Sequence, residues 1–186
     1  AEKQQAEIDA LLADARLVEQ TSQEAASKTL ARAAASRIIA AVESGAPFAT
    51  ALADFEATGA SDIPEALKFA ARDGVVTLAA LQGEIPSAAR SALAASPQDS
   101  EAGFSGFLKR QLGARSIAPR EGDDADAVLS RIEGAVRQGR LMDALAEAET
   151  LPIEAKSAMS DWLEKTTTRV AVTTASEALI QFLAAN

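Results

Sequence analysis

The chain has 186 residues, of which 48% are hydrophobic and only 4% aromatic, and its formal net charge is −9. It contains no histidine and no cysteine, so it lacks the commonest general base, the commonest metal ligand and the thiolate nucleophile. We therefore expect no metal site, no cofactor and no enzymatic activity. The acidic charge argues against a nucleic-acid partner, because such binding depends on cations that neutralise phosphates.

Alanine supplies much of the hydrophobic content, and this composition favours helices packed closely through small side chains. We predict an all-α fold, either an elongated helical bundle or an array of helical hairpins, with a long C-terminal helix. No apolar run approaches the roughly 20 residues that a membrane-spanning helix needs.

Residues 1–95 are predicted to form a helical region that begins with the end of a coiled coil and continues in short helices. Over residues 2–20 one stripe of apolar residues has the spacing of a coiled-coil seam or of a packed first helix. The stripe consists of Ile8, Leu11, Leu12, Ala15 and Val18. Thr21 and Glu24 have the spacing of a capping box, which marks either a new helix or a polar stretch inside one long helix.

Glycines at positions 45, 59 and 74 predict the ends of successive helices. The last helix of this region carries Leu78, Leu81 and Ile85, and we expect Pro86 to kink or split it. Residues 96–103, SPQDSEAG, have the small and polar composition of a linker.

Residues 104–120, FSGFLKRQLGARSIAPR, differ in charge from everything around them, and we call them the basic segment. They carry +4 and no acidic residue, so the rest of the chain carries −13. Apolar residues at i, i+3, i+4 and i+8 form one helical face beside the cations, a pattern typical of segments that bind anionic lipid headgroups. The predicted lipid-binding residues are Phe104, Phe107, Leu108, Lys109, Arg110, Leu112 and Arg115. The alternative is an ordinary helix whose phenylalanines pack on the domain.

Residues 121–186 are predicted to form a second helical domain. Asp124 is a strong N-cap for a helix over 125–138, Gly139 ends that helix, and a short helix over 141–148 completes a hairpin. The hairpin is similar to one tetratricopeptide repeat, but no second copy follows at about 34 residues. We expect residues 153–186 to form one helix. Candidate contacts with a partner or a second chain are Leu141, Leu145, Trp162, Val170, Leu179 and Leu183; for the tryptophan, a place in the core is the alternative.

Several stretches, taken in order, resemble the C-terminal domain of mitofilin and its alphaproteobacterial homologues. They are residues 121–124 (EGDD), 137–141 (RQGRL), 144–149 (ALAEAE), Leu151 with Pro152, Trp162, and the alanine- and valine-rich last helix. Residues 77–81 and Ile85 with Pro86 match the helical part that precedes that domain. Residues 107–115 occupy the place of the family's amphipathic lipid-binding segment.

The resemblance implies a non-enzymatic membrane-shaping scaffold of the bacterial inner membrane, with its soluble part in the periplasm. It implies an anionic phospholipid membrane and further copies of the chain as partners, with any other protein partner unidentified. It also implies a transmembrane anchor upstream of this chain. The alternative function is a tetratricopeptide-like module that docks a peptide or a partner protein.

Overall fold

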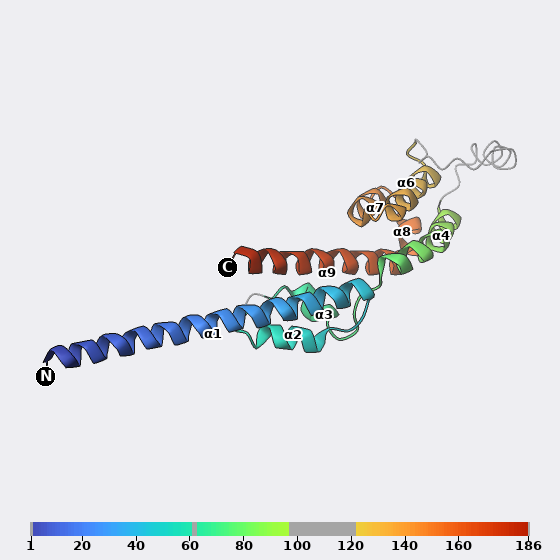
Figure 1. The fold of residues 1–186 in the computed structure, drawn as a ribbon. Helices are drawn as coiled ribbons and strands as arrows, with labels where there is room; N and C mark the ends of the chain where they lie inside the picture. The colour runs from blue at the N-terminus through green and yellow to red at the C-terminus, as the bar shows by residue number, and fades with distance from the viewer. Residues whose placement is uncertain (1, 61–62, 97–121, 186) are drawn as a thin grey trace. The chain divides into compact units, whose positions relative to one another are not determined.

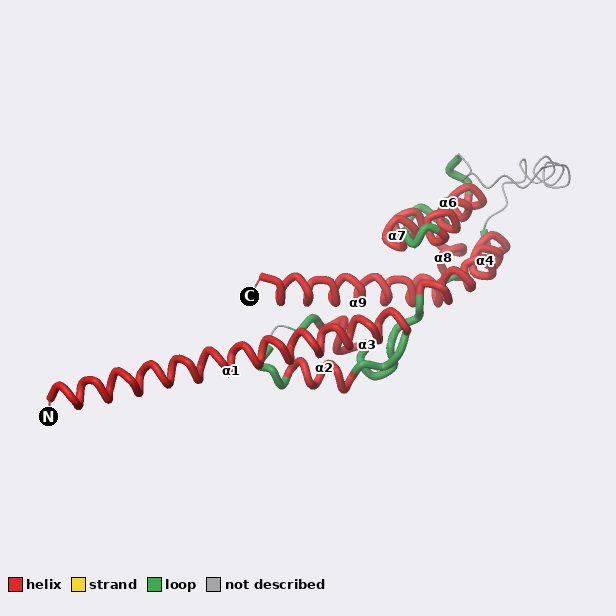
Figure 2. Tube along the Cα trace, in the orientation of Figure 1, coloured by secondary structure: helices red, strands yellow, loops and turns green. Residues whose placement is uncertain are grey.

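The computed structural model describes residues 2–60, 63–96 and 122–185 (Figure 1). Over these residues the chain forms helices joined by loops, without strands (Figure 2). The predicted all-α fold with a long C-terminal helix is confirmed.

The helices group into two compact units. Unit 1 combines Ala1–Gly74 with Val172–Asn186, and unit 2 is Val75–Ala171. These units do not follow the boundaries predicted from the sequence, since residues 75–95 group with the second domain and residues 172–186 with the first. Unit 1 therefore combines two stretches of the chain that lie far apart in the sequence.

Unit 1 is built on a long helix, α1 (Glu2–Ser44), which packs against α2 (Ala49–Glu56); α2 in turn contacts α3 (Glu65–Ala70). The Thr21 hydroxyl donates a hydrogen bond to the Val18 carbonyl, 2.9 Å away. The capping-box sequence is thus a polar stretch inside one long helix, the second of the two interpretations that its spacing allowed.

Only the C-terminal part of α1 is buried. Its buried residues recur at helical spacing on one face and are mostly small: Ala31, Ala34, Ala35, Ile38 and Val42. Opposite them, Leu52 and Phe55 of α2 are buried. The alanines let the two helices approach closely. Among these side chains, Phe55 is the largest and buries the most apolar area.

Two glycine turns of unit 1 touch through their backbones. Gly45 ends α1 with φ of 77°, and Gly74 has φ of 76°, so both adopt the left-handed conformation that favours glycine. A Cβ atom on Gly74 would lie 2.3 Å from the Gly45 carbonyl oxygen. Next to this contact, the Phe48 amide donates to the Ala71 carbonyl at 2.7 Å.

Unit 2 contains α4 (Leu78–Ala95), α6 (Ala125–Arg137), α7 (Leu141–Ala148), α8 (Ile153–Ala158) and the beginning of α9 (Ser160–Ala185). Helix α6 packs against both α7 and α4, and α4 packs against α8. The Asp124 carboxylate accepts from the Ala127 amide at 2.8 Å, which confirms it as the N-cap of α6. Gly139, with φ of 74°, separates α6 from α7 as predicted.

The C-terminal region corrects the prediction of one helix over 153–186. Helix α8 ends at Ala158 and α9 begins at Ser160, with Met159 between them at φ −118° and ψ 18°. Neither proline nor glycine marks this break. Met159 is 2% exposed, and Ala155 one turn earlier is fully buried, so burying both side chains in the core sets the direction of the chain here.

Helix α4 runs from Leu78 to Ala95 through Pro86, so of the two outcomes predicted from the sequence, a kink or a split, the split does not occur. The missing amide and the ring of a proline inside a helix cost about 3 kcal/mol. Buried residues on both sides of the proline, Leu81 and Ile85 before it and Ala89 and Ala92 after it, hold the helix together through core packing.

We predict that Gly74→Ala destabilises the protein more than Gly59→Ala. Gly59 has φ of +90° with open space around a Cβ atom, so its substitution costs only the conformational strain, about 1 kcal/mol. At Gly74 the added methyl also meets the Gly45 backbone, and we expect a loss of about 2 kcal/mol or more. Equal losses in denaturant unfolding would contradict the close contact between the two turns.

Candidate membrane and partner surfaces

The predicted lipid-binding residues all lie outside the residues that the structure describes. They are Phe104, Phe107, Leu108, Lys109, Arg110, Leu112 and Arg115. The lipid-binding assignment therefore stays a prediction from the sequence. What the structure does describe is how unit 2 holds the chain on either side of residues 97–121.

Both flanks of this stretch are held in unit 2. On the N-terminal side, Ser96 is 9% exposed and its hydroxyl donates to the Ala92 carbonyl at 2.9 Å, which closes the end of α4. On the C-terminal side, Arg131 of α6 donates to the Gly122 carbonyl at 2.7 Å and to the Glu147 carboxylate at 2.9 Å. Ser96 thus lies at a buried helix cap, and Gly122 lies beside an ion pair that joins α6 and α7.

The predicted partner contacts differ in burial and belong to two units. Three of them belong to the core: Leu141 is 8% exposed, Trp162 3% and Leu179 6%. The other three, Leu145, Val170 and Leu183, are half-buried. The first four residues in chain order belong to unit 2 and the last two to unit 1.

Trp162 anchors the start of α9 in unit 2. Its indole N–H donates to the Leu81 carbonyl of α4 at 3.1 Å, and its ring lies in a core formed by α4, α6, α7 and α8. The structure therefore supports the alternative interpretation, in which Trp162 is a core residue and not a partner contact.

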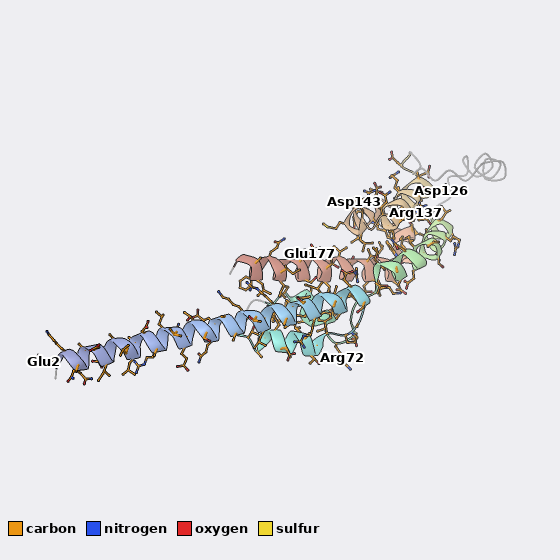
Figure 3. The ribbon with its side chains drawn as sticks, in the orientation of Figure 1. Glu2, Arg72, Asp126, Arg137, Asp143 and Glu177 are labelled. Atoms are coloured by element: carbon orange, nitrogen blue, oxygen red, sulfur yellow. The ribbon has the colours of Figure 1, made fainter. Side chains whose placement is uncertain are left out.

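Six of the exposed large hydrophobic side chains in the described part of the chain lie on α1. Every residue from 2 to 26 is exposed, and the N-terminal half of α1, with Glu2 near its tip, extends beyond α2 and α3 (Figure 3). Large apolar side chains lie along it: Ile8 is 50% exposed, Leu11 64%, Leu12 50%, Leu17 59% and Val18 61%. Soluble chains rarely leave such side chains adjacent and unburied unless the surface binds something.

Unit 1 also contains a groove with a cavity volume of about 320 Å³. Its walls come from residues 27–32 of α1, from residues 55–60 with Pro64, and from the C-terminal turns of α9. Phe55, Leu179 and Phe182 give it apolar sides, and the Arg32 guanidinium at its edge donates to the Leu183 carbonyl at 3.5 Å. The sequence could not indicate this groove, because its walls come from segments up to about 150 residues apart.

Lys68 and Glu65 of α3 form an ion pair. The Glu65 carboxylate accepts a hydrogen bond from Lys68 at 2.7 Å, and this contact raises the pKa of the Lys68 ammonium. A general base needs the opposite shift, toward neutral pH. Within the described ranges, no three or more Asp or Glu side chains gather in a way that could hold a metal ion.

Across residues 2–60, 63–96 and 122–185, no helix is both long and apolar enough to cross a bilayer. The chain matches no protein-family model, no curated protein and no solved structure. The resemblance to mitofilin therefore rests on the sequence stretches quoted above.

We predict that Trp162 reports on the core of unit 2 and not on an interface. As the only tryptophan in the chain, it should show blue-shifted fluorescence that does not change with protein concentration. Trp162→Phe removes the hydrogen bond to Leu81 and should cost about 1 kcal/mol in unfolding free energy. Trp162→Ala should cost about 3–5 kcal/mol.

The matched control is Phe69→Ala, because Phe69 is 82% exposed and its loss should change stability by less than about 0.5 kcal/mol. If the emission spectrum of the unchanged protein depends on its concentration, Trp162 lies in a partner interface and this prediction is wrong.

Proposed function

We propose that this chain is the soluble part of a non-enzymatic scaffold that binds an anionic membrane surface and self-associates. The observation that carries the proposal is the basic segment, with +4 in 17 residues against −13 in the rest of the chain. The exposed apolar side chains of α1 support the self-association.

The energy of the membrane contact follows from the residues of the basic segment. Full burial of a phenylalanine or a leucine contributes roughly 1.5–3 kcal/mol, and each cation near an anionic surface adds about 1 kcal/mol. A single segment then gives a reversible attachment that salt weakens. Since the remaining charge of −13 is repelled by anionic lipid, the basic segment is the part of the chain that contacts the membrane.

The flanks of the segment suit this role. They are held in the same unit by Ser96 and by Arg131, so the chain on either side of residues 97–121 is attached to the folded core of unit 2. The resemblance to mitofilin adds the location, the periplasmic side of a bacterial inner membrane, and the role in organising membrane invaginations and junctions. An amphipathic segment wedged below the headgroups expands one leaflet and favours curvature.

The second candidate function is a module that docks a peptide or a partner protein. The groove of unit 1 favours it, because a hollow of about 320 Å³ with apolar walls accepts one or two apolar side chains of a partner. The hairpin of α6 and α7, similar to one tetratricopeptide repeat, agrees with either function.

Co-sedimentation with vesicles tests the membrane function. We expect binding to vesicles that contain anionic phospholipid, no binding to neutral vesicles, and weaker binding at high salt. The double variant Phe107→Ser with Leu108→Ser should lower the affinity by about 100-fold or more, since it removes two inserted apolar side chains.

The matched control replaces two exposed apolar residues elsewhere, Phe69→Ser with Met142→Ser, which are 82% and 69% exposed. This control should bind as the unchanged protein does, and circular dichroism should show that both variants remain folded. Absence of binding to anionic vesicles at low salt would overturn the membrane function and leave the docking module as the better proposal.

A further inference from the structure

The groove of unit 1 combines apolar walls with positive charge. Phe55 and Leu179, which are 2% and 6% exposed, line it together with Phe182, which is 54% exposed. Among the described residues that line the groove, two carry a positive charge and none carries a negative one. The chain as a whole has 27 acidic residues against 18 basic ones, so the charge of this groove is opposite to that of the protein. It suits an apolar ligand that ends in a negative charge.

Arg32 is the side chain best placed to hold that charge. Its guanidinium lines the groove, and its one hydrogen bond among the described residues goes to the Leu183 carbonyl at 3.5 Å. This distance exceeds the roughly 2.7–3.2 Å of a well-formed N–H···O bond. A guanidinium carries several further N–H donors, and these can bind a carboxylate through two parallel hydrogen bonds.

The side-chain hydroxyls of the groove are already bonded within unit 1. The Ser27 hydroxyl donates to the Thr58 carbonyl at 2.9 Å, and the Thr58 hydroxyl donates to the Phe55 carbonyl at 2.6 Å. Lys28, one helical turn before Arg32, already has an interaction, so it adds positive charge but is not required as a donor to a ligand. A ligand therefore meets one guanidinium with donors to spare and apolar walls elsewhere.

We propose that this groove binds a free fatty acid, with the alkyl chain between the apolar walls and the carboxylate on Arg32. A volume of about 320 Å³ lies at the lower end of the roughly 300–1,000 Å³ typical of small-molecule sites, which favours one acyl chain over the two of a phospholipid. An acidic peptide fits less well, because its amides would leave water for walls with few hydrogen-bonding partners. The groove is distinct from the basic segment, so fatty-acid binding does not depend on the membrane function.

Isothermal titration calorimetry with decanoate, octanoate and 1-decanol separates the contributions of chain and charge. Decanoate should bind about 10-fold more tightly than octanoate, because two more methylene groups leave water. Decanol has the same chain length without the charge and should bind about 10-fold more weakly than decanoate. No binding of decanoate at millimolar concentration, or equal affinities for decanoate and decanol, would overturn the proposal.

The charge is tested by Arg32→Gln, which removes the guanidinium and leaves the apolar walls in place. This variant should bind decanoate about 10-fold more weakly and decanol with unchanged affinity. The matched control, Arg16→Gln, removes an exposed cation of α1 outside the groove and should change neither affinity. An equal loss of decanoate binding in the control would mean that decanoate responds only to the net charge, and the proposed site would be wrong.

The place of the alkyl chain is tested by Ala178→Phe. Ala178 is exposed and lines the groove, so the larger side chain should fill the groove without disturbing the core, and binding of both ligands should be lost. The control Ala171→Phe, at an exposed position of α9 outside the groove, should bind as the unchanged protein does. Circular dichroism should show that both variants remain folded. Unchanged binding by Ala178→Phe would exclude the groove as the site.

Co-sedimentation distinguishes a free fatty acid from the acyl chains of an intact membrane. Ala178→Phe should bind vesicles that contain anionic phospholipid as the unchanged protein does, because the basic segment is not altered. If this variant loses vesicle binding together with decanoate binding, the groove holds membrane lipid, and its assignment to a free fatty acid is wrong.

Discussion

The small size of the core side chains is the constraint on which this fold depends. Many of the buried positions in unit 2 are alanine: Ala89, Ala92, Ala135, Ala144, Ala148 and Ala155. Alanine permits close approach of helices but removes little apolar area from water, so it contributes little energy at each position. A core of this kind depends on its few large side chains. Trp162 is the largest of them, and its hydrogen bond to the Leu81 carbonyl fixes α9 against α4.

Close packing through small residues also accounts for the contact between Gly45 and Gly74 in unit 1, where two turns approach without side chains between them. In a chain with so few large apolar residues, leaving several of them in water forgoes stabilisation that their burial would give. Five on the N-terminal half of α1 nevertheless remain exposed, from Ile8 to Val18. Such an arrangement is informative because the same side chains would have strengthened a core that lacks them.

The sequence predicted the features that are set by a few neighbouring residues. Asp124 caps α6, and Gly45 and Gly139 end their helices, because an N-cap and a left-handed glycine act within one turn of the backbone. The sequence did not predict the break at Met159, since core burial decides it, and at Pro86 of α4 it left a kink and a split as alternatives.

The grouping of residues 172–186 with the first 74 residues, and the groove that follows from it, likewise depend on contacts between distant parts of the chain. The two candidate surfaces differ in what the sequence alone can indicate. The lipid-binding residues are predicted from the sequence alone, because their signal is one of local charge and spacing. The exposure of the apolar stripe of α1 needed the structure, since an amphipathic helix packed in a core has the same pattern.

On the proposed arrangement, membrane contact and self-association reside in different units, the first in the basic segment between α4 and α6 of unit 2 and the second on α1 of unit 1. Their separation has an energetic consequence. One basic segment gives a weak, salt-sensitive attachment, but a dimer carries two. Binding of the second segment then becomes intramolecular, with an effective concentration set by the distance between the copies. Self-association therefore converts a weak lipid contact into a stable one without any change in the segment itself.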